Sequence, residues 1–243
     1  MIWLLGKTEK NLFGLEKKNY ICSMIKIDKD RKVFVTSDTH YGHKNICRGV
    51  TAWKLPDGSV PIDQTRDFKT IEQMNEVIIS GINSIVGEDD VLIHLGDWSF
   101  GGFENIQKFR DRIVCKEIHL ILGNHDTHIE NNRDGVQELF TSVNHYTKLM
   151  YKFKTFVLSH YPIQSWDGLN KGHIQLHGHC HLPTNLRFGK GKKMDVGIDS
   201  HPMFGLYNID EIIRIMDKRE IMSDMLFDHH TDEIETEDGK KRK

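Results

Sequence analysis

Short apolar runs alternate with segments of helical periodicity through the first half of the chain. The runs at 32–38 (KVFVTSD), 90–97 (DVLIHLGD) and 118–122 (IHLIL) are rich in consecutive apolar and β-branched residues, which is typical of buried strands. Between them, apolar residues recur at three- and four-residue intervals over 67–86, and a similar spacing occurs at 103–114. Both stretches are therefore predicted to be amphipathic helices.

The second half of the chain is richer in strands. The segments 155–162 (TFVLSHYP), 172–181 (GHIQLHGHCH) and 192–199 (KKMDVGID) have strand character and short connections. Residues 208–219 (NIDEIIRIMDKR) are predicted to form a helix, with Asn208 as the N-cap and acidic residues in the first turn. This order of elements favours sheets with helices packed outside them.

A length of 243 residues fits one large domain. We assign the domain to 25–220, and we treat the charged, weakly patterned segment 1–24 as an N-terminal extension. The polar segment 221–243 lacks apolar periodicity and is predicted to be mobile. Apolar runs of a few residues are too short to span a membrane, and the N-terminus lacks a secretory pattern. A cytoplasmic protein without a membrane partner is expected.

Polar side chains that bind metals or donate protons stand at the ends of five predicted strands. Ligands in open α/β sheets bind beyond the carboxyl ends of strands, so these side chains are candidates for one shared site. The candidates are Asp38, His40, Asp97, Asn124, His125, Asp126, His160, His179 and His181.

The donor types indicate divalent metal ions. Two aspartates, one asparagine and four histidines form an oxygen and nitrogen set that suits Mn, Fe, Co, Ni or Zn and suits calcium poorly. Seven candidate ligands exceed what one ion with an open position can use, so two ions are expected. Paired ions about 3.5–4 Å apart repel each other, and a carboxylate that bridges them is expected on chemical grounds.

The ordered blocks DTH, GD, GNHD, H and GHCH between Asp38 and His181 resemble the signature of the calcineurin-like metallophosphoesterase superfamily. The longer strings TSDTHYGHKNI and HLGDWSF resemble its small single-domain phage and bacterial members. The resemblance implies a four-layer α/β/β/α fold, in which a two-sheet β-sandwich is flanked by helices. It also implies a hydrolase with a dinuclear metal centre, for which manganese is the most expected metal.

The resemblance also implies a role for each candidate. Asp38, His40 and His181 would bind the first ion; Asn124, His160 and His179 would bind the second; Asp97 would bridge both. His125 would protonate the leaving group or hold the phosphate, and Asp126 would orient His125, although an aspartate at this position could equally cap a helix. His43, Asn45 and Arg48, which follow the first block, are candidate substrate contacts.

These roles predict a phosphodiesterase that acts on a small nucleotide or related phosphoester by attack of a metal-bridging hydroxide. A metal-dependent DNA nuclease is the second hypothesis. The net charge of −2 and the lack of room for a DNA-capping domain make nucleic acid the less favoured partner. A non-catalytic binding module on the same fold is the third, and the intact ligand set argues against it. The substrate and the oligomeric state stay open.

Overall fold

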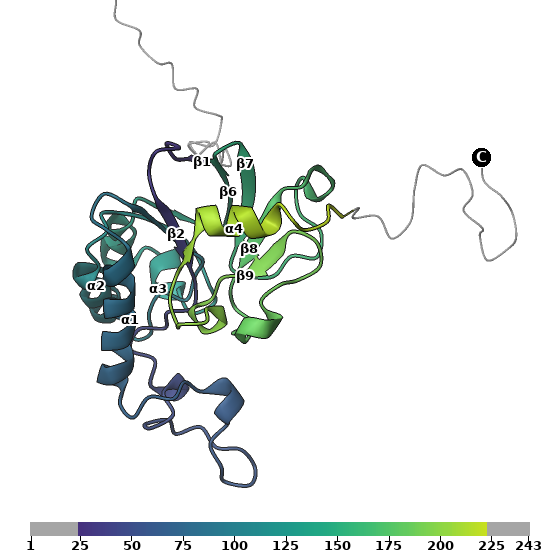
Figure 1. The fold of residues 1–243 in the computed structure, drawn as a ribbon. Helices are drawn as coiled ribbons and strands as arrows, with labels where there is room; N and C mark the ends of the chain where they lie inside the picture. The colour runs from purple at the N-terminus through teal and green to yellow at the C-terminus, as the bar shows by residue number, and fades with distance from the viewer. Residues whose placement is uncertain (1–23, 223–243) are drawn as a thin grey trace, which may run out of the picture.

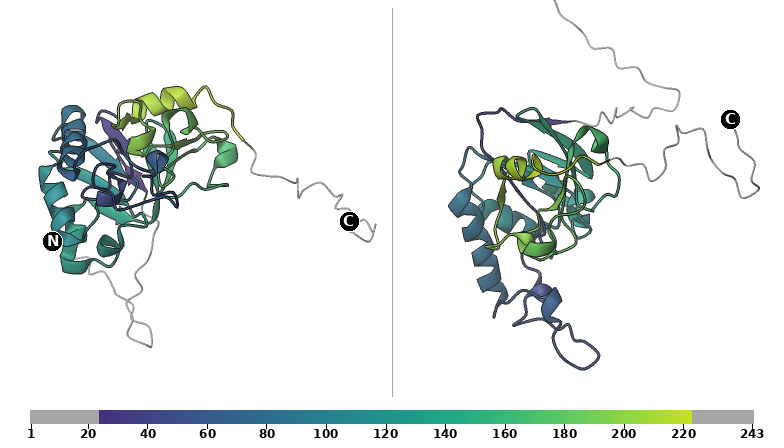
Figure 2. Two further views of the ribbon diagram at one scale, coloured as in Figure 1. Left: turned by 90° about the horizontal axis from the view of Figure 1, so that it is seen from below. Right: turned by 45° about the vertical axis from the view of Figure 1, so that its right-hand side comes forward.

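The computed structural model describes residues 24–222. Nearly all of the expected extension (1–24) and of the expected tail (221–243) lies outside the described residues, so both stay predictions. The described chain forms two five-stranded sheets. Figures 1 and 2 show helices on the outside of the molecule around them. The predicted sandwich flanked by helices is therefore confirmed.

The first sheet has the strand order β10-β2-β3-β4-β5. Strands β2 to β5 run parallel to one another, whereas β10 is antiparallel to β2. The bounds are Val33–Thr36 (β2), Val91–His94 (β3), Glu117–Ile121 (β4), Ser142–Asn144 (β5) and Tyr207–Asn208 (β10).

The second sheet has the order β1-β6-β7-β8-β9. Its single antiparallel pair in the described chain is β6 with β7, and the other neighbours are parallel. The bounds are Ile25–Lys26 (β1), Tyr146–Tyr151 (β6), Lys154–Ser159 (β7), Ile174–His177 (β8) and Lys193–Asp195 (β9).

Strand β2 shows why the buried strands have continuous apolar sequences. Side chains alternate between the two faces of a strand. Val33 and Val35 accordingly join an apolar cluster shared by both sheets, whereas Phe34 joins a cluster that contains residues of the outer helices. Because both faces are covered, all four residues of β2 are buried.

Helices α1 (Ile71–Ile85) and α2 (Phe103–Arg112) cover the outer face of the first sheet and lie side by side in Figure 1. Helix α1 begins later than the predicted 67–86 because the Thr70 side chain accepts a hydrogen bond from the Gln73 amide and acts as the N-cap. The Arg112 guanidinium of α2 donates to the Glu76 carboxylate of α1 at 2.7 Å, which joins the two helices.

The C-terminal helix α4 (Ile209–Met216) is the one predicted at 208–219, and Asn208 is its N-cap as expected. Its residues Ile209, Ile212 and Met216 pack into the cluster between the sheets. The outer face of the second sheet is covered differently, because Val157 packs against Trp166 and Leu169 of a loop with a short 3-10 helix. Among the described residues, no helix combines the length and the apolar character that crossing a bilayer requires.

Candidate active site

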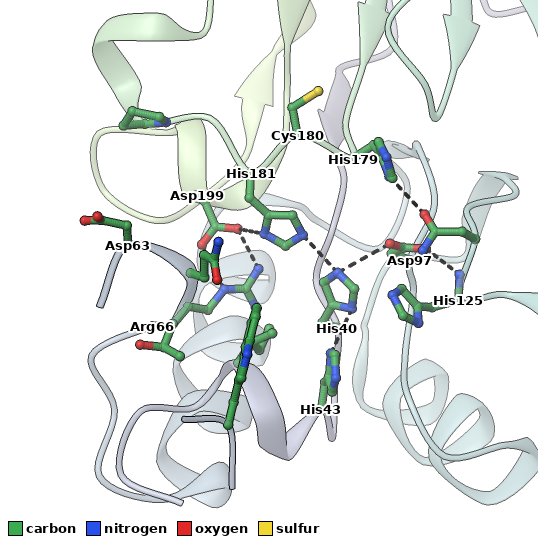
Figure 3. Close-up of a pocket in the computed structure, with 16 residues that line it drawn as sticks. His40, His43, Asp63, Arg66, Asp97, His125, His179, Cys180, His181 and Asp199 are labelled. Atoms are coloured by element: carbon green, nitrogen blue, oxygen red, sulfur yellow. Dashed lines mark hydrogen bonds and ion pairs between the residues drawn. The ribbon is translucent and has the colours of Figure 1, made fainter. Parts of the chain in front are cut away.

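The predicted ligands meet where strands of the two sheets end. Asp38, Asp97 and Asn124 follow the neighbouring parallel strands β2, β3 and β4, and their loops therefore leave the first sheet at one edge. His160 follows β7 and His179 follows β8 of the second sheet. The Asp38 carboxylate accepts a hydrogen bond from the His179 backbone amide, with distances of 3.0 and 3.1 Å to its two oxygens, so loops of the two sheets meet at the site. Figure 3 shows His179 and His181, which follow the second sheet, beside His40 and Asp97, which follow the first.

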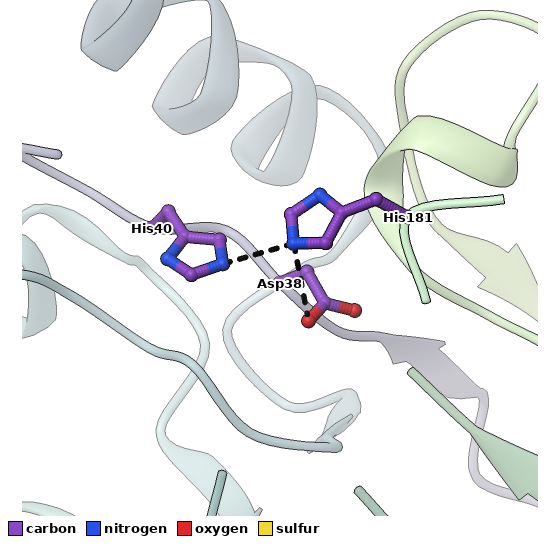
Figure 4. Close-up of side chains that lie close together, drawn as sticks. All are labelled: Asp38, His40 and His181. Atoms are coloured by element: carbon purple, nitrogen blue, oxygen red, sulfur yellow. Dashed lines mark hydrogen bonds and ion pairs between the residues drawn. The ribbon is translucent and has the colours of Figure 1, made fainter. Parts of the chain in front are cut away.

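One group of ligands contains Asp38, His40 and His181, whose donor atoms converge (Figure 4). The Nε2 atoms of His40 and His181 are 3.1 Å apart, and His181 Nε2 is 3.8 Å from Asp38 Oδ1. Burial raises the pKa of Asp38 to about 8 and lowers the pKa of His40 well below its ordinary value. A buried carboxyl group beside two imidazoles is a donor set that fits a divalent cation.

The second group contains Asn124, His160 and His179. The Asn124 Oδ1 atom is 3.1 Å from His160 Nε2 and 2.9 Å from His179 Nδ1. On its other side, the His160 ring contacts the Leu95 carbonyl through Nδ1 at 2.7 Å. This contact fixes the ring so that Nε2 faces the site.

Asp97 lies between the two groups. Its Oδ2 atom is 3.4 Å from His40 Nε2 and 3.5 Å from His160 Nε2, one histidine of each group. Its Oδ1 atom accepts a hydrogen bond from the His125 backbone amide at 2.9 Å, and this bond orients the carboxylate. The structure thus brings all seven predicted ligands together and puts the proposed bridging residue at the position that both groups share.

The backbone of the site is strained. Five of the seven predicted ligands have a left-handed conformation, with φ between 46° and 70°. Residues other than glycine adopt this conformation at a cost of about 1–3 kcal/mol each and keep it only where the surroundings impose it. The five are Asp38, His40, Asp97, His179 and His181. Such a concentration of strain is typical of functional sites.

Two motif glycines allow the loops to approach one another closely. A Cβ atom on Gly178 would lie 2.1 Å from Ser37 Oγ and 2.4 Å from Asp38 Oδ2. A Cβ atom on Gly123 would lie 2.2 Å from Asp97 Oδ1. Glycine is therefore required in GHCH and GNHD so that backbone can contact the two aspartates.

His125 is exposed and lies beside the first group, with its ring centroid 5.1 Å from that of His40. Asp126 does not make the expected contact with this ring, nor does its side chain cap α3 (Thr127–Glu130). Its carboxylate accepts the backbone amides of Asp97, Trp98 and Gly123 at 2.7–3.0 Å. Asp126 is 2% exposed, and it holds the loop that carries Asp97 rather than the His125 imidazole.

A cavity of about 740 Å³ opens over the ligands and includes His125 and His43. The His43 ring stacks on Phe100 with centroids 4.1 Å apart. Of the other two expected substrate contacts, Asn45 lines a separate, smaller pocket. Arg48 is used within its own loop, where it donates to the Ile62 and Thr65 carbonyls and pairs with Asp67 at 3.2 Å. Neither residue lines the main cavity.

The arginine that does line the cavity is Arg66, which sequence reasoning missed. Its guanidinium donates to both carboxylate oxygens of Asp199 at 2.8 Å and to the carbonyls of Asp38 and Thr39. The Asp199 carboxylate in turn accepts a hydrogen bond from Nδ1 of His181, with a distance of 2.7 Å between Nδ1 and Oδ2. Burial alone would raise the pKa of Asp199, but the charge of Arg66 and the hydrogen bonds from His181 and Arg66 lower it.

Because Asp199 occupies Nδ1 of His181, the other ring nitrogen, Nε2, faces His40 and Asp38. A histidine that binds metal commonly donates its other ring nitrogen to a carboxylate, which fixes its tautomer and orientation. No motif marks Arg66 or Asp199, which are 133 residues apart. A sequence signal for this pair was therefore lacking.

Comparisons with known proteins find relatives that match most of this chain. An uncharacterised protein of Methanocaldococcus jannaschii is 25% identical over 197 residues, which are 79% of this chain and 95% of that protein. The gene 66 protein of Mycobacterium phage L5 is 28% identical over 193 residues, 68% of this chain and 85% of that protein. A solved structure of a protein of unknown function from Aquifex aeolicus shares the fold, with a TM-score of 0.55 at 20% identity over 76% of this chain and 100% of that one.

The family model described as calcineurin-like phosphoesterase matches residues 31–237. This range contains all five motif blocks and every predicted ligand. On this match, the chain belongs to the calcineurin-like phosphoesterase family.

Proposed function

We propose that the protein is a dinuclear metal-dependent phosphohydrolase, and more narrowly a phosphodiesterase that acts on a small nucleotide or related phosphoester. The observation that carries this proposal is the position of Asp97 between two groups of ligands, within 3.4–3.5 Å of a histidine from each. One carboxylate shared by two sets of donors is the arrangement that a pair of nearby cations requires.

The first ion would be held by Asp38, His40 and His181, and the second by Asn124, His160 and His179. Two divalent cations bound there would neutralise a phosphate and make hydroxide available near neutral pH. The oxygen and nitrogen donors suit manganese, and iron, zinc, nickel and cobalt are the alternatives.

His125 would donate a proton to the leaving oxygen. It is exposed to the cavity, and its backbone amide donates a hydrogen bond to Asp97, which holds the backbone of His125 beside the ligand groups. An imidazole is a suitable general acid because its ordinary pKa lies near neutrality. An alkoxide leaves a phosphodiester only slowly without such a proton.

The direct test is hydrolysis of bis(p-nitrophenyl) phosphate by the chelator-treated protein, with Mn²⁺ added back and with EDTA as the control. We expect turnover that requires the metal and that saturates near two ions per chain by elemental analysis. Turnover without metal, or none with Mn²⁺, Fe²⁺, Zn²⁺, Ni²⁺ or Co²⁺, would contradict the proposal. In the second case the binding-module hypothesis would be preferred. Preference for long single- or double-stranded DNA over small diesters would favour a nuclease instead.

We expect Asp199→Asn to weaken Mn²⁺ binding by about 10- to 100-fold, because the His181 ring loses the carboxylate that orients it. Mn²⁺ binding to the metal-free protein can be measured by isothermal titration calorimetry, with circular dichroism to verify folding. Asp90→Asn is a matched control, since Asp90 is also half-buried and its carboxylate accepts a hydrogen bond from the Gly87 backbone amide, at a position where it contacts no predicted ligand. Equal Mn²⁺ affinity in the two folded variants would refute the orienting role.

A further inference from the structure

The main cavity extends well beyond the ligand groups. In Figure 3, His125 lies at one end and Asp63 at the other, with Arg66 and Asp199 between them. The part away from the ligands is walled by the segment 46–65 and by one residue after GHCH; these residues are Ile46, Trp53, Asp63, Gln64, Thr65 and Pro183. A phosphate alone would leave this part of the cavity empty, so the walls there have room to contact another portion of a substrate.

Trp53 differs from the other tryptophans that the structure describes. Trp98 is fully buried and packs on Phe109 and Phe140. Trp166 is 6% exposed and donates its indole N–H to the His173 carbonyl. Trp53, by contrast, is 43% exposed, and within residues 24–222 its ring has neither an aromatic partner nor a hydrogen bond at Nε1. A large apolar ring held in a cavity wall without a partner is available to a ligand.

We propose that Trp53 is the platform of a nucleobase subsite, so that the substrate is a nucleoside phosphodiester whose base stacks on the indole. This inference rests on the proposed function, because it places the phosphodiester at the two ligand groups. Every nucleobase has an aromatic face, and stacking on an aromatic side chain is a common way to bind bases without sequence preference. Ile46 and Pro183 supply the remaining apolar walls.

The rim of the same region favours a base over an alkyl chain. Asp63 and Gln64 belong to the short 3-10 helix Ile62–Gln64 and line the cavity with exposed polar side chains. A carboxylate and a carboxamide can exchange hydrogen bonds with the ring nitrogens and amino groups at a base edge. A volume of about 740 Å³ lies within the range of ligand pockets, roughly 300–1,000 Å³, and accommodates a nucleoside beside the phosphate.

The test compares two diesters with the same leaving group, thymidine 5′-(p-nitrophenyl phosphate) and methyl p-nitrophenyl phosphate. We expect Trp53→Ala to lower kcat/KM for the thymidine ester by about tenfold or more, and to lower it far less for the methyl ester. Trp53→Phe should recover most of the loss because phenylalanine still offers a ring. Leu55→Ala is the matched control, since Leu55 is a similarly exposed apolar residue of the same loop that does not line the cavity.

Binding without turnover separates this inference from the proposed function. Titration of the Mn²⁺-loaded protein with thymidine 5′-monophosphate and with methyl phosphate should show tighter binding of the nucleotide, and Trp53→Ala should remove that difference. If the wild type binds the nucleotide through Trp53 but hydrolyses neither diester, the proposed function fails and the subsite stands. Equal losses on both esters, or an unchanged preference for the nucleotide in Trp53→Ala, would overturn the subsite.

Discussion

Replacing Asp97 with asparagine is expected to empty both halves of the metal centre and to reduce hydrolysis by about three orders of magnitude or more. The Oδ2 atom of Asp97 faces His40 and His160, which belong to different ligand groups. Asparagine keeps the size and the oxygen that accepts the His125 amide but removes the negative charge. Two cations held close together would then repel each other without compensation. Metal content by elemental analysis and the rate with bis(p-nitrophenyl) phosphate would measure the two effects.

A matched control is Asp111→Asn, which removes the same charge from an exposed position on α2. It should bind two ions and retain the wild-type rate, which excludes an effect of net charge alone. Asp97→Asn that retains two ions per chain and normal turnover would show that the carboxylate is not the bridge. The pairing of the two ligand groups would then need another explanation.

Replacing His125 with alanine is expected to separate metal binding from proton transfer. His125 lines the cavity, and one of its ring nitrogens lies within 4.8 Å of donor atoms of His40 and Asp97. Because the proposed function assigns it proton transfer and not metal binding, metal content should be unchanged. Loss of a general acid typically costs about 10²–10⁴-fold. The loss should be large for diesters with alkoxide leaving groups and small for p-nitrophenyl esters, because p-nitrophenolate needs little protonation when it leaves.

Two measurements make this prediction specific. The ratio of rates for an alkyl diester and a p-nitrophenyl diester should fall in His125→Ala and stay constant in His128→Ala, whose residue lies on α3 and does not line the cavity. Parallel losses on both esters would argue that His125 holds the phosphate instead of protonating the leaving oxygen. Loss of metal would show that it is a ligand.

The strands that end at the site, and the residues that follow them, can be predicted from the amino-acid sequence. Continuous apolar runs marked β2, β3 and β4 because both faces of these strands are buried. The same criterion missed β6, whose pattern alternates between buried and exposed positions and includes Tyr146 and Lys148. It also missed β1, β5 and β10, which have only two or three residues. Such short strands are defined by their partners more than by their own pattern.

The motif spacing likewise supplied all seven predicted ligands, because residue types that bind metals after buried strands are a local signal. Which side chains support or adjoin these ligands is known only from the folded chain. Asp126 holds the Asp97 loop, Arg66 reaches Asp199 and through it His181, and Trp53 lines the cavity where Arg48 was expected. These roles depend on hydrogen bonds and contacts between segments far apart in the chain. Such contacts follow from how the loops of the folded chain pack against one another, and no periodicity or spacing in the sequence encodes them.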